Sequence, residues 1–145
     1  MAETKTDAQD SYILDDQVGY IMRLASQKHA AIYQSHALQG LTATQFAALA
    51  RLYEQGKCSQ NHLGRLASMD VATIKGVVDR LRQKGYALVE SDPNDKRRSL
   101  ISLSPQGQQL VENMFPVAHQ ITAETLAPLT AAEQRKLLKL LRKLT

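Results

Sequence analysis

Residues 59–104 decide the fold of this chain and read SQNHLGRLASMDVATIKGVVDRLRQKGYALVESDPNDKRRSLISLS. Ser59 and Asp70 each stand before a short run with helical periodicity. Side chains of these types accept a hydrogen bond from a free backbone N–H in the first turn, so both are predicted helix N-caps. Gly85 follows the second run and predicts its end. The segment therefore begins with two short helices separated by a turn.

A β-hairpin is predicted directly after the second helix. Residues 86–90 and 100–103 are short apolar runs typical of strands, and they flank the turn-forming basic segment DPNDKRR, residues 92–98. This order of elements predicts a winged helix-turn-helix. Its second helix would fit the major groove of DNA, and the basic hairpin would reach the neighbouring minor groove or backbone.

The second helix, residues 71–84, has two contrasting sides. Its apolar side carries Ile74, Val77, Val78 and Leu81, which are predicted core residues. Its opposite side carries Ala72, Thr73, Gly76, Arg80 and Gln83. Thr73 can hydrogen-bond to a base edge, and its methyl group can contact the methyl group of thymine. Lys75 and Arg80 are predicted to pair with phosphates, which fixes the register of the protein without reading sequence.

Gly76 is unfavourable in the interior of a helix, by about 1 kcal/mol relative to Ala. One explanation is a close approach of the helix backbone to DNA. Relief of crowding, or simple tolerance, explains the glycine equally well at this stage.

The tip of the predicted hairpin places three cations, Lys96, Arg97 and Arg98, beside Asp92 and Asp95. Cations in a projecting hairpin are attracted to the negative potential of a narrow minor groove. Asp95 is predicted to pair with Arg97 and to hold its guanidinium in one orientation.

Composition and charge agree with a DNA-binding protein. The chain has 145 residues, 43% hydrophobic and 22% charged, which fits one globular domain. Its net charge is +4, and residues 57–98 alone hold nine Lys and Arg against five Asp and Glu. The N-terminus lacks the apolar region of a secretory signal, and no run is apolar enough for a membrane helix. A cytoplasmic protein without membrane contact is expected.

The flanking segments are predicted helices. Residues 13–37 show helical periodicity, with Ile13, Val18, Ile21, Leu24, Ala25, Ala31 and Ile32 as candidate buried positions. Thr42 and Thr130 each begin a predicted capping box, and Pro116 is expected to bend or interrupt the helix that starts at Pro105. The outer helices are more apolar than a small winged domain requires. They therefore predict an interface between two copies of the chain, with a helical pair inside one copy as the alternative.

The stretch DVATIKGVVDRLRQKGYALVESDPNDKRRSLISLSPQG, residues 70–107, resembles the MarR family of bacterial transcriptional regulators. The matching parts are the helix end VVDRLRQKG, the D-x-R pattern formed by Asp95 and Arg97, and the strand with its cap, SLISLSPQG. The resemblance implies a homodimer that binds a pseudo-palindromic operator, usually as a repressor, and leaves it when a small molecule binds. It places Arg97 in the minor groove and Thr73 and Gly76 opposite the bases, where many members have a larger polar residue than Gly76.

The resemblance covers nearly the whole chain and implies one MarR-type domain over residues 1–145. Residues 11–38 and 105–145 would be dimerisation helices, and residues 42–104 the winged helix-turn-helix. The residues expected to bind DNA are Ser59, Gln60, Ala72, Thr73, Lys75, Gly76, Arg80, Lys96, Arg97 and Arg98, with Asp95 orienting the wing.

Family pockets lie between the first two helices and the start of the long helix after the wing. The residues expected to line such a pocket here are Tyr20, Arg23, His29, Tyr33, Phe46, Leu49 and Tyr53. Aromatic walls with a cationic group suit a planar aromatic carboxylate. The segment DDQVGYIMRLASQKHAAIYQ, residues 15–34, also resembles the first helix of members tied to the breakdown of aromatic acids.

Other kinds of function have weaker support. Cys58, next to Lys57 and a helix start, could make a thiol switch, and a DNA-binding protein without any ligand is a further alternative. The four histidines lack the spacing of a structural metal site, so neither metal nor cofactor is expected. No catalytic motif is present, and an enzyme is not expected.

Overall fold

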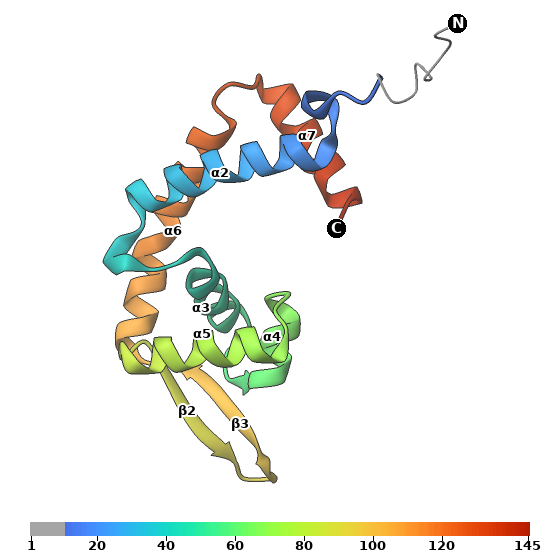
Figure 1. Cartoon of the computed structure of the whole chain (residues 1–145). Helices are drawn as coiled ribbons and strands as arrows, with labels where there is room; N and C mark the ends of the chain where they lie inside the picture. The colour runs from blue at the N-terminus through green and yellow to red at the C-terminus, as the bar shows by residue number, and fades with distance from the viewer. Residues whose placement is uncertain (1–10) are drawn as a thin grey trace, which may run out of the picture. The chain divides into compact units, whose positions relative to one another are not determined.

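The computed structural model describes residues 11–145 and is mainly helical, with one small antiparallel sheet. It contains two compact units (Figure 1). The winged unit comprises residues 36–123, and the helical unit comprises residues 11–35 and 124–145. The predicted fold class, mainly α with a β-wing, is confirmed.

The winged unit contains η2 (Leu38–Gly40), α3 (Ala43–Gln55), β1 (Cys58–Ser59), α4 (Gln60–Leu66), α5 (Val71–Gln83), β2 (Ala87–Asp92), β3 (Asp95–Leu103) and most of α6 (Pro105–Leu126). The helical unit contains η1 (Leu14–Asp16), nearly all of α2 (Val18–His36), the end of α6 and α7 (Ala131–Lys143). We call α5 the recognition helix and the β2–β3 hairpin the wing.

The predicted helix caps are confirmed. Thr42 and Thr130 form complete capping boxes with Gln45 and Glu133, and Ser59 and Asp70 cap α4 and α5. Gly85 has a φ of 82°, in the left-handed region that favours glycine after a helix end. These helix boundaries are therefore fixed by local hydrogen bonds.

The core of the winged unit is built from apolar side chains of every long element in it. The largest fully buried members are Leu41, Leu49, Leu52, Leu63, Ile74, Val78, Leu81, Ile101, Val111 and Met114. All four apolar residues predicted for the recognition helix are buried. Burial of each such side chain contributes about 1.5–3 kcal/mol, and together they fix which side of α5 faces outward.

The sheet has the order β1–β3–β2, and β1 pairs with β3 through Cys58 opposite Ile101. The wing strands are longer than predicted, so residue 92 and residues 95–98 belong to strands and only residues 93 and 94 form the turn. β1 was not predicted, because two residues carry no periodic signal and pair only with a partner distant in sequence.

The junction between the recognition helix, the wing and α6 is held by Ser104 and Gly107. Ser104 Oγ donates to the carbonyl of Gly85 at 2.5 Å and accepts from the N–H of Gly107 at 3.0 Å. A Cβ atom on Gly107 would lie 2.0 Å from the carbonyl oxygen of Tyr86. Only a residue without a side chain allows the two backbones to approach this closely.

Pro116 does not interrupt α6, which continues as one helix from Pro105 to Leu126. The expectation of an interruption was wrong, and its alternative, a bend at Pro116, stays a prediction. Pro116 removes one backbone hydrogen bond, while Leu110, Val111 and Met114 remain buried on the preceding turns. Packing of these side chains holds the helix together on the N-terminal side of the proline.

The helical unit leaves most of its apolar surface uncovered. Of the candidate buried positions of α2 and its N-terminal flank, Ile13, Val18, Ile21 and Leu24 are 45–63% exposed, and α7 has no buried residue. The expectation that they are buried was wrong for the single chain, because the other described residues of the helical unit do not cover them. Within residues 11–145, none of the helices combines the length and apolar character needed to span a bilayer.

Candidate nucleic-acid interface

The recognition helix presents a small, polar outer side. Asp70 accepts a hydrogen bond from the N–H of Thr73 at 2.7 Å, which fixes the first turn of the helix. The pKa of the Asp70 carboxyl is held below its usual range by hydrogen bonds, of which the bond from the Thr73 backbone N–H has the largest effect. Ala72, Thr73, Lys75 and Arg80 are exposed, whereas Gly76 is half-buried. The helix therefore offers few obstructions near its N-terminal end and long cations further along.

The two cations of this side differ in their surroundings. Lys75 Nζ lies 3.0 Å from Oδ2 of Asp79, one turn further along the helix. Arg80 forms no ion pair in the set resolved for residues 11–145. One of its guanidinium nitrogens lies 3.5 Å from the position that a Cβ atom on Gly76 would occupy. Arg80 thus folds back along the helix, over the glycine.

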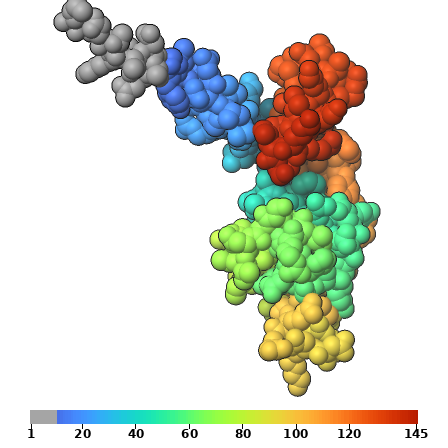
Figure 2. All heavy atoms as spheres, turned by 90° about the vertical axis from the view of Figure 1, so that its right-hand side faces the viewer, coloured from blue at the N-terminus to red at the C-terminus, as the bar shows by residue number. Residues whose placement is uncertain are grey.

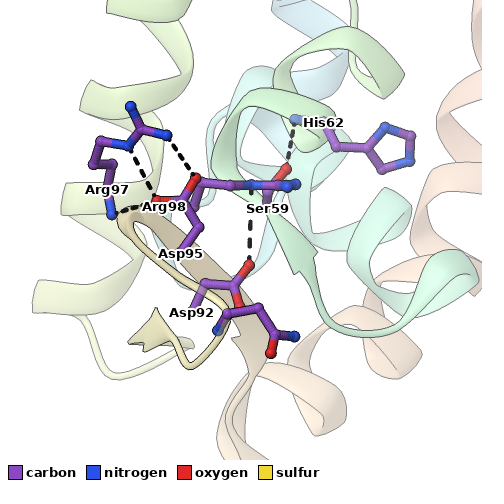
Figure 3. A network of polar contacts seen from close by, with 7 residues as sticks. Ser59, His62, Asp92, Asp95, Arg97 and Arg98 are labelled. Atoms are coloured by element: carbon purple, nitrogen blue, oxygen red, sulfur yellow. Dashed lines mark hydrogen bonds and ion pairs between the residues drawn. The ribbon is translucent and has the colours of Figure 1, made fainter.

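Asp95 and Arg97 form the predicted pair at the wing (Figure 3). Oδ1 of Asp95 accepts hydrogen bonds from the backbone N–H of Arg97 at 3.0 Å and from its Nε at 3.2 Å. Both hydrogen bonds lower the pKa of the Asp95 carboxyl, and the bond from the Arg97 side chain has the larger effect. The carboxylate is therefore ionised at neutral pH. The Arg97 side chain is 91% exposed. Its guanidinium is therefore oriented while it stays accessible.

A second arginine pair, between Arg98 and Asp92, was not predicted from the sequence. Arg98 Nε lies 4.0 Å from Oδ2 of Asp92, and the Asp92 carboxylate is only 13% exposed. Asp92 also accepts from the N–H of Asn94 at 2.9 Å. The sequence does place Asp92 six positions before Arg98, but this spacing alone does not predict a contact. The antiparallel pairing of β2 with β3 brings the two side chains together.

A polar recess of about 110 Å³ lies between the wing and the start of α4. We call it the wing recess; it is lined by Ser59, Gln60, Asn61, Arg97, Arg98 and Ser99. The fold thus brings Ser59 and Gln60 together with Arg97 and Arg98, which lie about 40 positions later in the sequence. All four are predicted DNA-binding residues. Ser59 is 7% exposed, and its Oγ accepts from the N–H of His62 at 3.2 Å (Figure 3). The recess is large enough for several waters or one tetrahedral oxyanion, since one water needs only about 10–15 Å³ of such space.

The wing projects from the winged unit beyond α4 and α5 (Figure 2). Lys57 and Glu90 form an ion pair that connects the segment before β1 to strand β2. Together with the pairing of β1 and β3, this contact fixes the base of the wing relative to α4. The cationic tip, with Lys96 exposed, is therefore carried on a supported hairpin.

Two of the three pocket residues predicted in the winged unit, Phe46 and Tyr53, are in an aromatic cluster. The ring of Phe115, which was not predicted, contacts those of Phe46 and Tyr53 edge to face, with centroids 6.1 and 5.1 Å apart. Leu49 is fully buried, so we assign it to core packing.

The pocket residues predicted in the helical unit lie along α2. The guanidinium of Arg23 lies 5.5 Å from the ring centroid of Tyr20, which is a cation–π contact. His29 Nδ1 is 2.8 Å from Oγ1 of Thr125, which was also not predicted. Tyr33 is buried, and this burial raises its pKa to about 12.

Cys58 has poor properties for a thiol switch. It is half-buried in β1, and burial raises the pKa of its thiol. A raised pKa reduces the thiolate fraction at neutral pH, and the thiolate is the reactive form. Within residues 11–145 no group of three His, Cys, Asp or Glu side chains is arranged to hold a metal ion.

The MarR family model matches residues 41–99, from the start of the winged unit to the middle of β3. The chain is also 37% identical over 134 residues to the HTH-type transcriptional repressor NicR of Pseudomonas putida, covering 92% of this chain and 85% of NicR. The chain belongs to the MarR family. The resemblance seen in the wing and recognition helix is therefore confirmed, and the protein is a MarR-type transcriptional regulator.

Two solved structures of high similarity agree with this MarR-type fold. A probable transcriptional regulator from Pseudomonas aeruginosa is 50% identical, with a TM-score of 0.89, covering 92% of this chain and all of that one. BpsR of Bordetella bronchiseptica is 41% identical, with a TM-score of 0.87, covering 92% and 96% of the two chains. The BpsR structure concerns regulation of its DNA binding by 6-hydroxynicotinic acid.

Proposed function

We propose that this chain is a homodimeric cytoplasmic repressor that binds a pseudo-palindromic operator and leaves it when a small aromatic carboxylate binds. One observation carries the DNA-binding part of this proposal. The exposed side of the recognition helix and the two ion-paired arginines of the wing lie on the same winged unit.

The two arginines have different proposed roles on the operator. Arg97, almost fully exposed and oriented by Asp95, enters the minor groove, whose negative potential attracts a guanidinium. Arg98, at the wing recess with Ser59 and Gln60, binds a backbone phosphate. Thr73 on α5 contacts base edges, and Lys75 and Lys96 add phosphate contacts.

Dimerisation is supported by the uncovered apolar surface of the helical unit. A helix of the length of α7, 13 residues, is marginal alone in water, and its packing normally provides the missing stability. The exposed apolar residues of this unit are Tyr12, Ile13, Leu14, Val18, Ile21, Met22, Leu24, Leu138, Leu140, Leu141 and Leu144. Two-fold symmetry lets identical surfaces cover each other, so a second copy is the proposed partner.

Selection of bound duplexes from a random library tests operator binding and dimerisation together. We expect enriched sequences with two inverted half-sites whose centres lie about 10 base pairs, or a multiple of this, apart. Light scattering of the complex should give two chains per duplex. Enrichment of single half-sites, or a monomer at micromolar concentration, would contradict the dimeric proposal.

The proposed effector is an aromatic acid of the hydroxypyridine carboxylate type. The relative BpsR is regulated by 6-hydroxynicotinic acid, and NicR is 37% identical to this chain. The proposed contacts in the helical unit are the cation Arg23, the hydrogen-bonding His29, and the rings of Tyr20 and Tyr33. A carboxylate matches the charge of Arg23, and a planar ring matches aromatic side chains.

We expect 6-hydroxynicotinic acid to raise the melting temperature and to weaken binding to the selected operator. A ligand at about 100 times its Kd stabilises the folded state by about 2.7 kcal/mol, which corresponds to a rise of roughly 5 °C or more. 6-Hydroxynicotinamide, which differs only by having an amide in place of the carboxylate, is the matched control and should change neither quantity. If a panel of aromatic acids leaves both quantities unchanged, the protein is a ligand-independent DNA binder instead.

A further inference from the structure

Gly76 lies in the middle of the recognition helix, and the packing of the winged unit does not require it. A Cβ atom built on Gly76 would meet a single atom within 4 Å, a guanidinium nitrogen of Arg80 at 3.5 Å. Apart from the backbone of the same helix and the two chain neighbours, neither core side chains nor other backbone atoms come within 4 Å of this position. Its φ is also outside the left-handed region, where glycine has an advantage. Relief of crowding therefore does not explain this glycine, although it costs the helix about 1 kcal/mol.

Arg80 uses the space that Gly76 leaves. Long side chains on a helix point back toward its N-terminus, so Arg80 reaches over the residue one turn before it. The N-terminal turns are also the part of a recognition helix that contacts base edges. The guanidinium of Arg80 is thus displaced toward the bases, to the place where a residue at position 76 would present its own side chain.

The guanidinium of Arg80 is also available for hydrogen bonding. No ion pair resolved within the described part of the chain involves it, whereas Lys75, Arg97 and Arg98 each face an aspartate. The free planar group can donate two parallel hydrogen bonds. Guanine offers the matching pair of acceptors, O6 and N7, in the major groove.

We propose that Arg80, lying over Gly76, is a specificity-determining residue that recognises one guanine in each operator half-site. This inference rests on the proposed function and changes the role predicted for Arg80 from a phosphate contact to a base contact. Gly76 acts indirectly, by leaving the path of the Arg80 side chain open. An alanine fits at this position, because 3.5 Å is an ordinary van der Waals distance. A longer side chain would compete with the Arg80 guanidinium for the same space.

The test compares the base preferences of variants on duplexes selected with the wild-type protein. Every base pair of one half-site is substituted in turn, and the dissociation constant is measured for wild type, R80A, R80K, G76A and G76Q. R82A serves as the matched control, because Arg82 is an exposed arginine on the same helix but lies on its flank. Melting temperature and oligomeric state are measured for each variant.

We expect wild type and G76A to prefer guanine at one position by roughly tenfold or more, since a bidentate contact discriminates by this amount. R80A should lose the preference at that position only, and R80K should keep it only in part, because an ammonium lacks the planar fork of the guanidinium. G76Q should lose or change the preference at the same position. R82A should weaken binding equally for all sequences.

The inference is overturned if R80A weakens binding to all sequences equally and lowers its salt dependence, because that is the behaviour of a phosphate contact. It is equally overturned if R80A keeps the preference for guanine, because the guanidinium then does not read the base, whether or not G76Q folds. Failure of the wild-type protein to bind any duplex would instead refute the proposed function itself. The two failures are therefore distinguishable.

Discussion

Replacing Arg97 by Ala is expected to weaken operator binding about 100-fold. Each base or groove contact by an arginine contributes about 1–3 kcal/mol, and a dimer loses two of them. The dependence of log Kd on log salt concentration should also become shallower by about two, since two cations no longer displace counterions. Titration of labelled operator at several salt concentrations measures both quantities.

Arg51 provides the control for Arg97. It is an exposed arginine in an ion pair with Glu54 on α3, and R51A should change operator affinity less than twofold. Both variants should keep the melting temperature and oligomeric state of the wild type, because exposed ion pairs contribute little to stability. If R97A binds as tightly as wild type at every salt concentration, the wing does not contact DNA.

Replacing Gly107 by Ala is expected to destabilise the winged unit by about 3 kcal/mol, at the upper end of the usual cost of overpacking. The added Cβ would lie 2.0 Å from the carbonyl oxygen of Tyr86 and 2.9 Å from its carbonyl carbon. Backbone atoms cannot move aside as the end of a flexible side chain can, so the start of α6 must shift. Urea unfolding at fixed protein concentration measures the change.

The matched control is Gly76→Ala, which adds the same methyl group to a helix with free space. It should leave stability unchanged or raise it by up to about 1 kcal/mol, because alanine is the better helix former. A G107A variant that unfolds at the same urea concentration as wild type would show that the junction adapts without cost.

The helix boundaries and the exposed side of α5 were predictable from the sequence, because both depend on residues a few positions apart. The capping boxes at Thr42 and Thr130 and the caps at Ser59 and Asp70 are hydrogen bonds within three residues of each other. The apolar side of α5 follows from the helical repeat alone. The Asp95–Arg97 pair was predictable for the same reason, since its members are two positions apart.

Contacts between distant segments were not predictable from periodicity. Strand β1 exists only because Cys58 meets Ile101, and the packing of Phe115 with Phe46 and Tyr53 joins separate helices. Likewise, α2 and its N-terminal flank show the pattern of a buried helix, but the pattern does not tell which surface covers it. Val18 is 63% exposed in the single chain, which points to a partner outside it.

The sequence by itself thus determined the order of elements, their caps and the cations of the wing, because a helix, a cap or a tight turn is decided by residues a few positions apart. Only the tertiary structure decided that Arg98 lies beside Asp92 at a recess with Ser59, that Gly107 touches the backbone of Tyr86, and that Arg80 lies over Gly76. The first two depend on strand pairing and on the junction between the wing and α6. The third depends on the direction taken by one long side chain, which helical periodicity does not specify.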